Sequence, residues 1–419
     1  MSTQTHPVKA DAAMTSGKGH VIIIGGGIAG PAIALFLKKI GITSTIYEAY
    51  PHIDDIGGGM QIAPNGMNVL KEIGVADRIF KSGALASEMC FRNDRGRVLA
   101  RIRNGRTEKC GQPAVAIARS ILHQILVDEV VQQGIQVEYQ KRLKNISETN
   151  DKKAIAQFED GTTAEGDFVI GADGLRSRTR DILLPNSPKP FYTGMLGIGG
   201  FAAQSAIPTS NPRDKTTMHM TFGPGGFFGY CNCSPSEESE LLWWSNLPRA
   251  EEMTKAQLAA ISTEDMRQEL LAIHRDWHEP IAALLMNTPT IFKGGIYDIA
   301  TLPTWHSDRI VLIGDAAHAM GPHSGQGASL ALEDAMYLVK LLRQSPGQLP
   351  QVFAQFERDR RPRVEQINAQ TRRIGEGKRV SKSNPIASWF RDRFMSLGIS
   401  LFAERGQDWM YNYRIIWDN

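Results

Sequence analysis

The chain has 419 residues, of which 42% are hydrophobic and 22% are charged, and its formal net charge is +3 at pH 7. This composition is typical of a soluble globular protein and excludes a disordered, coiled-coil or collagen-like chain. The length suits one large domain or two closely packed domains with room for a buried cofactor.

The distribution of charged residues does not indicate a polyanionic partner such as a nucleic acid. The densest basic run, Arg358 to Arg363, contains Asp359 and Pro362 and lies within an otherwise helical pattern. Such a run predicts a solvated helix face and not a nucleic-acid surface. We therefore expect no nucleic-acid partner.

The sequence also predicts no secretion signal, no membrane attachment and no metal site. Residues 1–18 are polar, which predicts a disordered tail and not a signal peptide. The longest apolar runs are too short to span a bilayer, so no obligate membrane attachment is expected. Two of the four cysteines, Cys231 and Cys233, are too close together for a normal disulfide or a recognisable zinc pair. We expect a cytoplasmic protein without a metal site.

The first predicted elements form a βαβ unit. Residues 20–24 are a short β-branched run suited to a buried parallel strand, residues 31–39 follow a helical apolar pattern, and residues 43–48 form a second strand. Two more buried strand-like pieces lie far along the chain, at 168–172 and 309–314. They suggest one sheet that is built from distant segments, so its domain is discontinuous.

The middle of the chain has a different character. Residues 185–300 contain short alternating or aromatic runs between Gly, Pro and Ser. This pattern predicts an antiparallel sheet with a helix or two around residues 254–274. After Gly325 the chain is expected to be helical to its end, with breaks near Pro346, Pro350 and Pro385.

The turn after the first strand carries a dinucleotide fingerprint. Gly25, Gly27 and Gly30 have GxGxxG spacing. The first allows a tight turn, the second lets the backbone approach a pyrophosphate, and the third permits close packing of helix on strand. The N-terminus of the next helix then offers free N–H groups to the phosphates. Glu48 ends the second strand, where its carboxylate can accept hydrogen bonds from ribose hydroxyls, and it argues against a 2′-phosphate.

Two further motifs follow in order. One is GADGLRSRTR, from Gly171 to Arg180, and the other begins GDAAH at Gly314 and leads through Gly327 into a helix. Together with the glycine turn, they resemble the group A flavoprotein monooxygenases, the family of para-hydroxybenzoate and salicylate hydroxylases and of the tetracycline-modifying monooxygenases. The resemblance extends from His20 to about residue 373.

The resemblance implies an α/β fold. It consists of a discontinuous Rossmann-like (GR2-type) FAD-binding domain, an inserted antiparallel-sheet substrate domain and a C-terminal helical region. In this interpretation residues 19–184 and 301–375 form the FAD-binding domain, residues 185–300 form the substrate domain, and residues 376–419 form the C-terminal segment.

The resemblance also implies a set of FAD contacts. Asp315 would bind the ribityl chain, and the N–H groups of Gly325 and Gly327 would face the flavin. Asp173 and Arg119 would help to hold the cofactors, with surface salt bridges as the alternative for both. The expected FAD-binding residues are Gly25, Gly27, Ile28, Ala29, Gly30, Glu48, Ala49, Gly59, Gln61, Arg119, Asp173, Asp315, Pro322, Gly325, Gly327 and Ala328. The family often has Asn where Ser329 stands, and the glycines at 57–59 could be either a turn near the flavin or only a hinge.

The implied activity is hydroxylation by a single-component flavoprotein. NAD(P)H reduces FAD, O₂ adds at flavin C4a, and the hydroperoxide transfers one oxygen atom to a small, mostly apolar or aromatic substrate. The protein must then supply a dry apolar pocket. The aromatic residues of the segment expected to face the flavin are Phe222, Phe227, Phe228, Tyr230 and Trp243, although core packing is favoured for each taken singly.

His323 is the first candidate for a catalytic base, because it follows Pro322 in the flavin-facing loop. His219 and Tyr230 are weaker candidates. A packing or solvent-facing histidine is the alternative for His323, and His318 is expected to brace the loop.

Several alternatives stay open at this point. An FAD-dependent dehydrogenase or oxidase of the same fold would lack oxygen transfer, whereas the intact motifs disfavour a regulatory flavin binder. A halogenase is disfavoured because residues 243–248 lack the WxWxIP motif. The apolar stripe at 385–402 predicts a helix packed over the substrate domain, with contact to a membrane surface as the alternative. NADH or NADPH, and a monomer or a homodimer, are equally compatible with the sequence.

Overall fold

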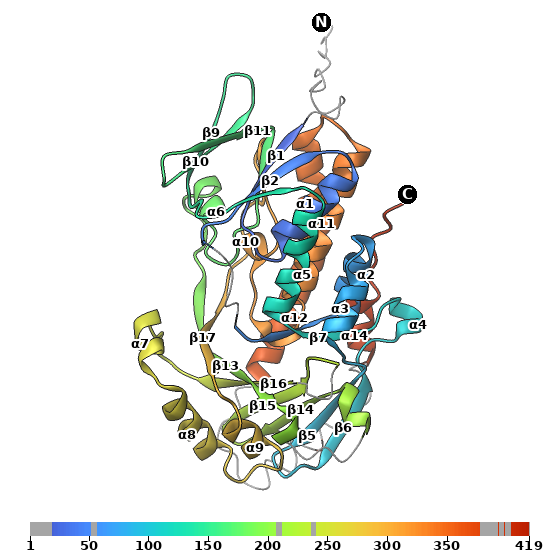
Figure 1. The fold of residues 1–419 in the computed structure, drawn as a ribbon, viewed down its shortest axis with the longest axis vertical. Helices are drawn as coiled ribbons and strands as arrows, with labels where there is room; N and C mark the ends of the chain where they lie inside the picture. The colour runs from blue at the N-terminus through green and yellow to red at the C-terminus, as the bar shows by residue number, and fades with distance from the viewer. Residues whose placement is uncertain are drawn as a thin grey trace, which may run out of the picture.

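The computed structural model describes residues 19–51, 57–206, 212–235, 240–377, 393, 398 and 404–418. The predicted tail at 1–18 lies outside the described residues. So does the predicted apolar stripe at 385–402, apart from two isolated positions. Two bodies are stacked along the long axis, one rich in helices and one built on a broad sheet (Figure 1).

The first body is built on a five-stranded parallel sheet with the strand order β18-β12-β1-β2-β8. Its strands are β1 (His20–Ile24), β2 (Thr43–Tyr47), β8 (Gln136–Glu138), β12 (Phe168–Gly171) and β18 (Ile310–Leu312). The β-branched run of β1 is central and has a parallel neighbour on each side, as expected for a strand buried on both faces. The predicted discontinuous Rossmann-like domain is therefore confirmed.

Long helices pack against one face of this sheet. They include α1 (Ala29–Lys39), α5 (Arg119–Gln132), α11 (Gly327–Gln344) and α12 (Leu349–Gly377). A smaller antiparallel sheet packs on the other side, through a core that includes Tyr47 and Phe158. It consists of β9 (Leu143–Glu148), β10 (Ala154–Phe158) and β11 (Thr163–Gly166). The parallel sheet thus lies between helices and strands, and its carboxyl edge points toward the second body.

A short sheet and several short helices complete the first body. The sheet consists of β3 (Gly59–Ile62), β7 (Val115–Ala118) and β4 (Ala84–Leu85). The helices are α2 (Pro64–Glu72), α3 (Ala76–Ser82), α4 (Thr107–Cys110), α6 (Arg178–Leu183) and α10 (Asp315–His318).

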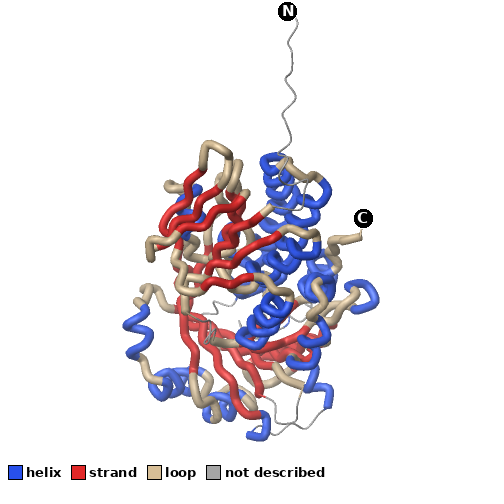
Figure 2. Tube along the Cα trace, turned by 45° about the horizontal axis from the view of Figure 1, so that its top comes forward, coloured by secondary structure: helices blue, strands red, loops and turns tan. Residues whose placement is uncertain are grey.

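The second body is a seven-stranded sheet with the order β17-β13-β16-β15-β14-β5-β6. Its strands are β5 (Glu88–Asn93), β6 (Val98–Arg103), β13 (Phe191–Ala203), β14 (Thr217–Gly223), β15 (Gly226–Asn232), β16 (Glu240–Pro248) and β17 (Ile291–Asp298). Helices α8 (Thr263–Ile273) and α9 (Ile281–Met286) lie on its far side from the first body, and α7 (Lys255–Ala260) lies beside its edge (Figure 2).

This sheet differs in one respect from the predicted insert at 185–300. Strands β5 and β6 come from the earlier part of the chain, and β5 pairs with β14 in parallel, whereas the other pairs are antiparallel. Pairing between segments more than 100 residues apart leaves no local signal in the sequence, so the sequence boundary at 185 missed these strands.

The chain returns to the first body at its C-terminal end. Helix α14 (Glu404–Tyr411) lies beside α2, and Lys340 and Arg343 donate hydrogen bonds to the carbonyl oxygens of Ile416 and Trp417. The Trp417 ring packs on Phe36, with centroids 5.0 Å apart. Among the described helices, none combines the length and the apolar character that a bilayer span requires.

Candidate active site

The three glycines of the first turn each meet a different steric demand. Gly25 has a φ of +107°, a backbone conformation that side chains disfavour. A Cβ on Gly30 would lie 2.0 Å from the Gly25 carbonyl oxygen, so only glycine lets α1 start this close to β1. A Cβ on Gly27 would meet nothing within 4 Å, and Gly27 borders a large cavity. The open space at the second glycine leaves room for a phosphate, as the fingerprint predicts.

Glu48 holds this turn in place. Its Oε2 accepts a hydrogen bond from the N–H of Gly26 at 2.7 Å, and its Oε1 accepts one from the N–H of Tyr50 at 3.0 Å. A carboxylate oxygen can accept more than one hydrogen bond, so both oxygens keep the capacity to bind a ribose hydroxyl. Glu48 and Ala49 directly follow β2 and are not among the residues that line the cavity.

The cavity has a volume of about 1190 Å³ and lies between the glycine turn and the seven-stranded sheet. It is larger than the roughly 300–1,000 Å³ of a pocket for one small ligand, which leaves room for a cofactor and a substrate together. The predicted FAD-binding residues that line it are Gly27, Ile28, Ala29, Gly59, Gln61, Arg119, Asp315, Pro322, Gly325, Gly327 and Ala328. The other five, which are not among the lining residues, are Gly25, Gly30, Glu48, Ala49 and Asp173.

Asp315 is the acid with the best access to this cavity. It is the first residue of α10, after Gly314, whose φ of +57° and ψ of −140° turn the chain at the end of β18. Its carboxylate is exposed and accepts no hydrogen bond from the described residues. A sugar or ribityl hydroxyl is a suitable donor for such a group, so the position fits the predicted FAD contact.

Asp173, in contrast, is occupied by its own segment. Its carboxylate accepts hydrogen bonds from Ser177 Oγ at 2.6 Å, from Thr179 N at 2.9 Å and from Thr179 Oγ1 at 3.0 Å. Burial raises the pKa of Asp173, although these hydrogen bonds oppose the change. The carboxylate thereby organises the start of α6, while its neighbours Gly174 and Leu175 border the cavity.

The glycines at 57–59 permit a close approach between the two bodies. A Cβ on Gly57 would lie 2.7 Å from the Phe292 ring, and a Cβ on Gly59 would lie 2.4 Å from Leu242 Cδ2. Arg119, at the start of α5, donates its backbone N–H to the Gly58 carbonyl at 3.1 Å. This segment is therefore packed against the seven-stranded sheet at the border of the cavity.

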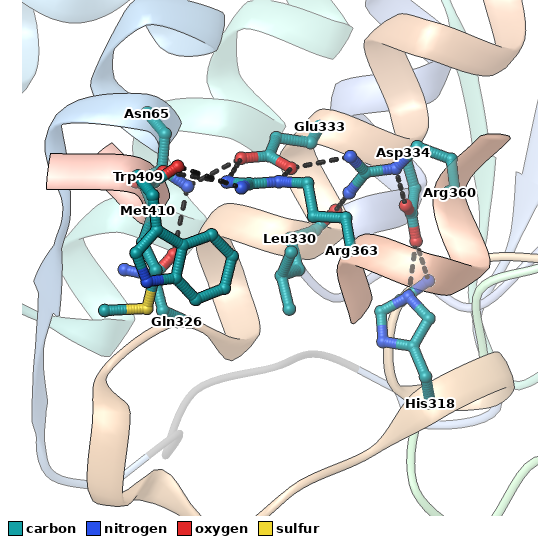
Figure 3. A network of polar contacts seen from close by, with 11 residues as sticks. Asn65, His318, Gln326, Leu330, Glu333, Asp334, Arg360, Arg363, Trp409 and Met410 are labelled. Carbon is teal, nitrogen blue, oxygen red and sulfur yellow. Dashed lines mark hydrogen bonds and ion pairs between the residues drawn. The ribbon is translucent and has the colours of Figure 1, made fainter. Parts of the chain in front are cut away.

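A buried polar network supports the loop that was predicted to face the flavin (Figure 3). This loop contains the short helix η4 (Pro322–Ser324) and then Gly325, whose φ is +64°. Asn65 on α2 donates to Gln326 Oε1 at 3.0 Å and to Glu333 Oε1 at 2.7 Å. Gln326 is only 1% exposed, so these bonds connect the start of α11 to a neighbouring helix.

Two adjacent acids on α11 anchor this network. Asp334 accepts hydrogen bonds from the N–H of Gly314 at 2.9 Å, from His318 Nε2 at 2.6 Å and from Arg360 Nε at 2.8 Å. Glu333 pairs with Arg363 at 2.8 Å and lies 2.7 Å from Arg360 Nη1. His318 thus braces the turn at Gly314.

The network overturns the prediction of a solvated face for the run from Arg358 to Arg363. The side chain of Arg360 is fully buried and that of Arg363 is 9% exposed, whereas Arg358 is 69% exposed. The prediction was wrong for two members of the run because it treated neighbours in sequence as neighbours in space. On a helix, residues this close in sequence point in different directions.

The seven-stranded sheet presents alternate residues to the cavity and to its outer core. Met218, Met220 and Phe222 of β14 line the cavity, whereas His219 lies on the opposite face. There its ring stacks on Tyr230, with centroids 4.5 Å apart and planes 8° apart.

This environment does not support a catalytic role for either residue. Burial lowers the pKa of His219 to about 3, assisted by the charges of Arg92 and Arg101. Burial also raises the pKa of the Tyr230 phenol. Neither group lines the cavity, and we do not carry them forward as bases.

The other aromatic residues that were expected to face the flavin also divide between the cavity and the outer core. Phe222 lines the cavity and packs on Phe227, with centroids 5.2 Å apart. Phe228 and Trp243 stack at 5.3 Å in the outer core against α8 and α9, and Trp243 also borders the cavity.

His323 borders the cavity at the other side, as part of η4. Its ring packs against α12, since a Cβ on Gly375 would lie 2.5 Å from His323 Cδ2. The glycine therefore lets the loop approach the helix closely. His323 is the only one of the three predicted bases that lines the cavity.

Sequence reasoning missed several residues that line the cavity. They include Met89, Phe91, Leu242, Trp244, Asn246, Met410 and Tyr411. The Tyr411 hydroxyl lies 3.3 Å from Gln61 Nε2 and accepts its hydrogen bond, and burial raises the Tyr411 pKa to about 12. Side chains alternate between the two faces of a strand, so the sequence could have grouped Met89 with Phe91 on β5, and Leu242 with Trp244 and Asn246 on β16. It did not indicate which face of each strand borders the cavity.

Comparisons with known proteins agree with this geometry. A family model described as an FAD binding domain matches residues 18–371. The aurachin C monooxygenase/isomerase of Stigmatella aurantiaca is 30% identical over 385 residues, which cover 90% of this chain and 94% of that protein. The 6-hydroxynicotinate 3-monooxygenase of Bordetella bronchiseptica is 28% identical, with coverages of 95% and 96%.

Solved structures show the same fold. Klebsiella pneumoniae HpxO, complexed with FAD and uric acid, matches with a TM-score of 0.82 at 22% identity, over 96% of this chain and 98% of that chain. A salicylate hydroxylase substrate complex matches with a TM-score of 0.77 at 21% identity, over 94% and 95% of the two chains. The chain therefore belongs to the FAD-binding domain family, and it is an FAD-dependent monooxygenase of the group A type.

Proposed function

We propose that this protein is a single-component hydroxylase that reduces its FAD with NADH or NADPH and transfers one atom of O₂ to a small, apolar aromatic molecule. One observation carries the proposal. A single cavity joins the glycine turn and Asp315 on one side to an apolar face of the seven-stranded sheet on the other. Oxygen transfer from a bound flavin requires that the substrate lie in contact with the cofactor. We call the part of the cavity beside the glycine turn and Asp315 the cofactor half, and the part beside the seven-stranded sheet the substrate half.

FAD, when bound, supplies the redox chemistry, and the residues of the chain bind and orient the reactants. The N–H groups of Gly327 and Ala328 lie in the first turn of α11, where they have no acceptor within the helix. Both residues border the cavity, so their N–H groups and the helix N-terminus can stabilise negative charge on a reduced ring.

The substrate half keeps water away from the reacting atoms. Met218, Met220 and Phe222 form an apolar surface there, and a dry site favours oxygen transfer over loss of the oxidant to water. His323 lies at the border of the two halves and is our candidate for accepting a proton from a substrate hydroxyl.

The aromatic class of substrate rests on a relative. The 6-hydroxynicotinate 3-monooxygenase acts, by its name, on an aromatic ring, and we extend that class to this chain. The four cysteines are buried and free, which suits the reducing cytoplasm that we propose as its location.

The test begins with the purified protein saturated with FAD. Aromatic and polyketide-like compounds are screened for stimulation of NADH or NADPH oxidation, and the product of each hit is analysed after turnover under ¹⁸O₂. One ¹⁸O atom in the product is the expected result. Stimulated oxidation that yields only H₂O₂ with every hit would assign the protein to the oxidases, and turnover without O₂ would assign it to the dehydrogenases.

A further inference from the structure

The face of the seven-stranded sheet that borders the cavity, which we call the floor of the substrate half, carries no charged side chain among its described residues. The strand residues that alternate toward the cavity are Met89 and Phe91 on β5, Met218, Met220 and Phe222 on β14, Cys231 on β15, Leu242, Trp244 and Asn246 on β16, and Phe292 on β17. All of these side chains are uncharged, and Asn246 is the polar amide among them. The floor therefore offers a ligand a largely apolar surface, in which the Asn246 amide is the group with both a strong donor and a strong acceptor.

The charged side chains among the described lining residues lie elsewhere. They are Arg119, Lys293 and Asp315. Arg119 and Asp315 belong to the cofactor half, beside Gly58 and at the end of β18. Lys293 is two residues from Ile291, which packs in the outer core, so strand alternation directs both side chains to the outer face. A carboxylate on the substrate would therefore meet no cation on the described floor.

Asn246 is the amide that the floor presents to a substrate. It is 4% exposed and borders the cavity, and its backbone pairs with Gly197 and Phe227 in the sheet. Its side-chain amide makes no hydrogen bond with the described residues. A buried amide of this kind offers one acceptor atom and two donor hydrogens to a ligand, and a polar group placed in a largely apolar wall fixes the orientation of what binds there.

We propose that the substrate is an uncharged molecule with a ring and an extended apolar part, and that Asn246 orients it through a hydrogen bond to a hydroxyl, carbonyl or ring N–H group. This inference rests on the proposed function, since it names the substrate class of the same cavity. A buried carboxylate without a partner is strongly disfavoured, whereas a neutral hydroxyl needs only one hydrogen bond. The flexible side chains of Met89, Met218 and Met220 can adapt to the shape of a bulky apolar group.

Three ligands with one shared ring test the proposal in the FAD-loaded protein: naphthol, naphthalene and naphthoate. Binding is measured at pH 7 through the change in flavin absorbance and by calorimetry, without NAD(P)H. Naphthol should bind at least tenfold more tightly than naphthoate. In a series of alkylphenols, each added methylene should improve the dissociation constant by about fourfold until the cavity is full.

Two variants locate the polar contact. Asn246→Leu should weaken naphthol binding by about two- to tenfold and leave naphthalene binding unchanged, because only naphthol can use the amide. Asn287→Leu is the matched control, since Asn287 is exposed at the end of α9, and it should change neither constant. Flavin content and the melting temperature are measured for each variant, and Asn246→Ala is used instead if the leucine variant does not fold.

Three results would overturn the inference: naphthoate binding as tightly as naphthol, equal loss of naphthol and naphthalene in Asn246→Leu, or no binding of any of the three. Because binding needs neither NAD(P)H nor O₂, these results are independent of turnover. Tight binding of neutral ligands without oxygen incorporation would contradict the proposed function and leave the ligand class intact.

Discussion

Arg360 permits a direct test of the buried charge network (Figure 3). Its guanidinium lies 2.7 Å from Glu333 Oε2 and donates to Asp334 Oδ1 at 2.8 Å, and its side chain is fully buried. Arg360→Met keeps an unbranched, helix-favouring side chain but removes the cation from two buried carboxylates. Breaking a buried ion pair on one side costs about 3–5 kcal/mol. Because Arg363 still pairs with Glu333, we expect a loss near 3 kcal/mol in the free energy of unfolding.

The matched control lies two residues earlier on the same helix. Arg358 is 69% exposed, and its guanidinium is 3.8 Å from Asp359. Arg358→Met should therefore change the free energy of unfolding by less than about 0.5 kcal/mol. Both variants are unfolded in urea at pH 7 with saturating FAD and followed by tryptophan fluorescence. A difference between them of less than about 1 kcal/mol would refute the role that we assign to the network.

The pH dependence separates lost charge from lost packing. Burial alone would raise the pKa of Asp334, but the charges of His318 and Arg360, together with hydrogen bonds from His318 and Gly314, outweigh it and lower the pKa. A carboxyl group with a lowered folded pKa stabilises the protein above its unfolded pKa of about 4, and this stabilisation is lost as pH falls through the folded pKa. The deficit of Arg360→Met should thus be largest near pH 7 and shrink below about pH 4. A deficit that stays constant over this range would indicate packing of the arginine stem.

Three further predictions concern the cavity. Asp315→Ala should sharply lower the FAD content of the purified protein while Cys233→Ser leaves it unchanged, and equal flavin content in both would contradict the role of Asp315. Gly27→Ala should fold normally but bind FAD at least about tenfold more weakly, whereas Gly30→Ala should lower the melting temperature because its methyl would lie 2.0 Å from a carbonyl oxygen of the turn. His323→Phe should retain FAD and its spectrum but divert NAD(P)H oxidation to H₂O₂, and normal coupling with an unchanged pH profile of kcat would assign His323 to packing.

The cofactor half could be predicted because its requirements are local in sequence. At the first turn, the positive φ of Gly25 and the close approach of Gly30 to the Gly25 carbonyl oxygen disfavour any residue with a side chain. The glycine spacing in the sequence therefore indicates the backbone geometry of the turn. Asp173 shows the limit of this reasoning. The residue has its predicted place near the cofactor half, but its carboxylate is bound by Ser177 and Thr179, and no spacing rule distinguishes a ligand contact from a helix-start contact.

The substrate half could not be predicted in the same way because it depends on strand alternation and on pairing between distant segments. His219 lies between two cavity-lining methionines in sequence, yet one step along a strand turns a side chain to the other face. Alternation alone gives two possible faces. The pairing of β14 with β5, which lies more than 100 residues earlier, determines which of them meets the cofactor domain.

The basic run on α12 differs from these cases, because its burial was indicated by the sequence. Phe353, Phe356, Arg360, Val364 and Ile367 follow one another at spacings of three and four residues, which places Arg360 on the apolar stripe of the helix. All five are at most 1% exposed. A buried arginine needs carboxylate partners, and the third motif continues into a helix with two adjacent acids. Periodicity combined with charge balance would therefore have predicted the pairing of α12 with α11, and with it the support of the flavin-facing loop.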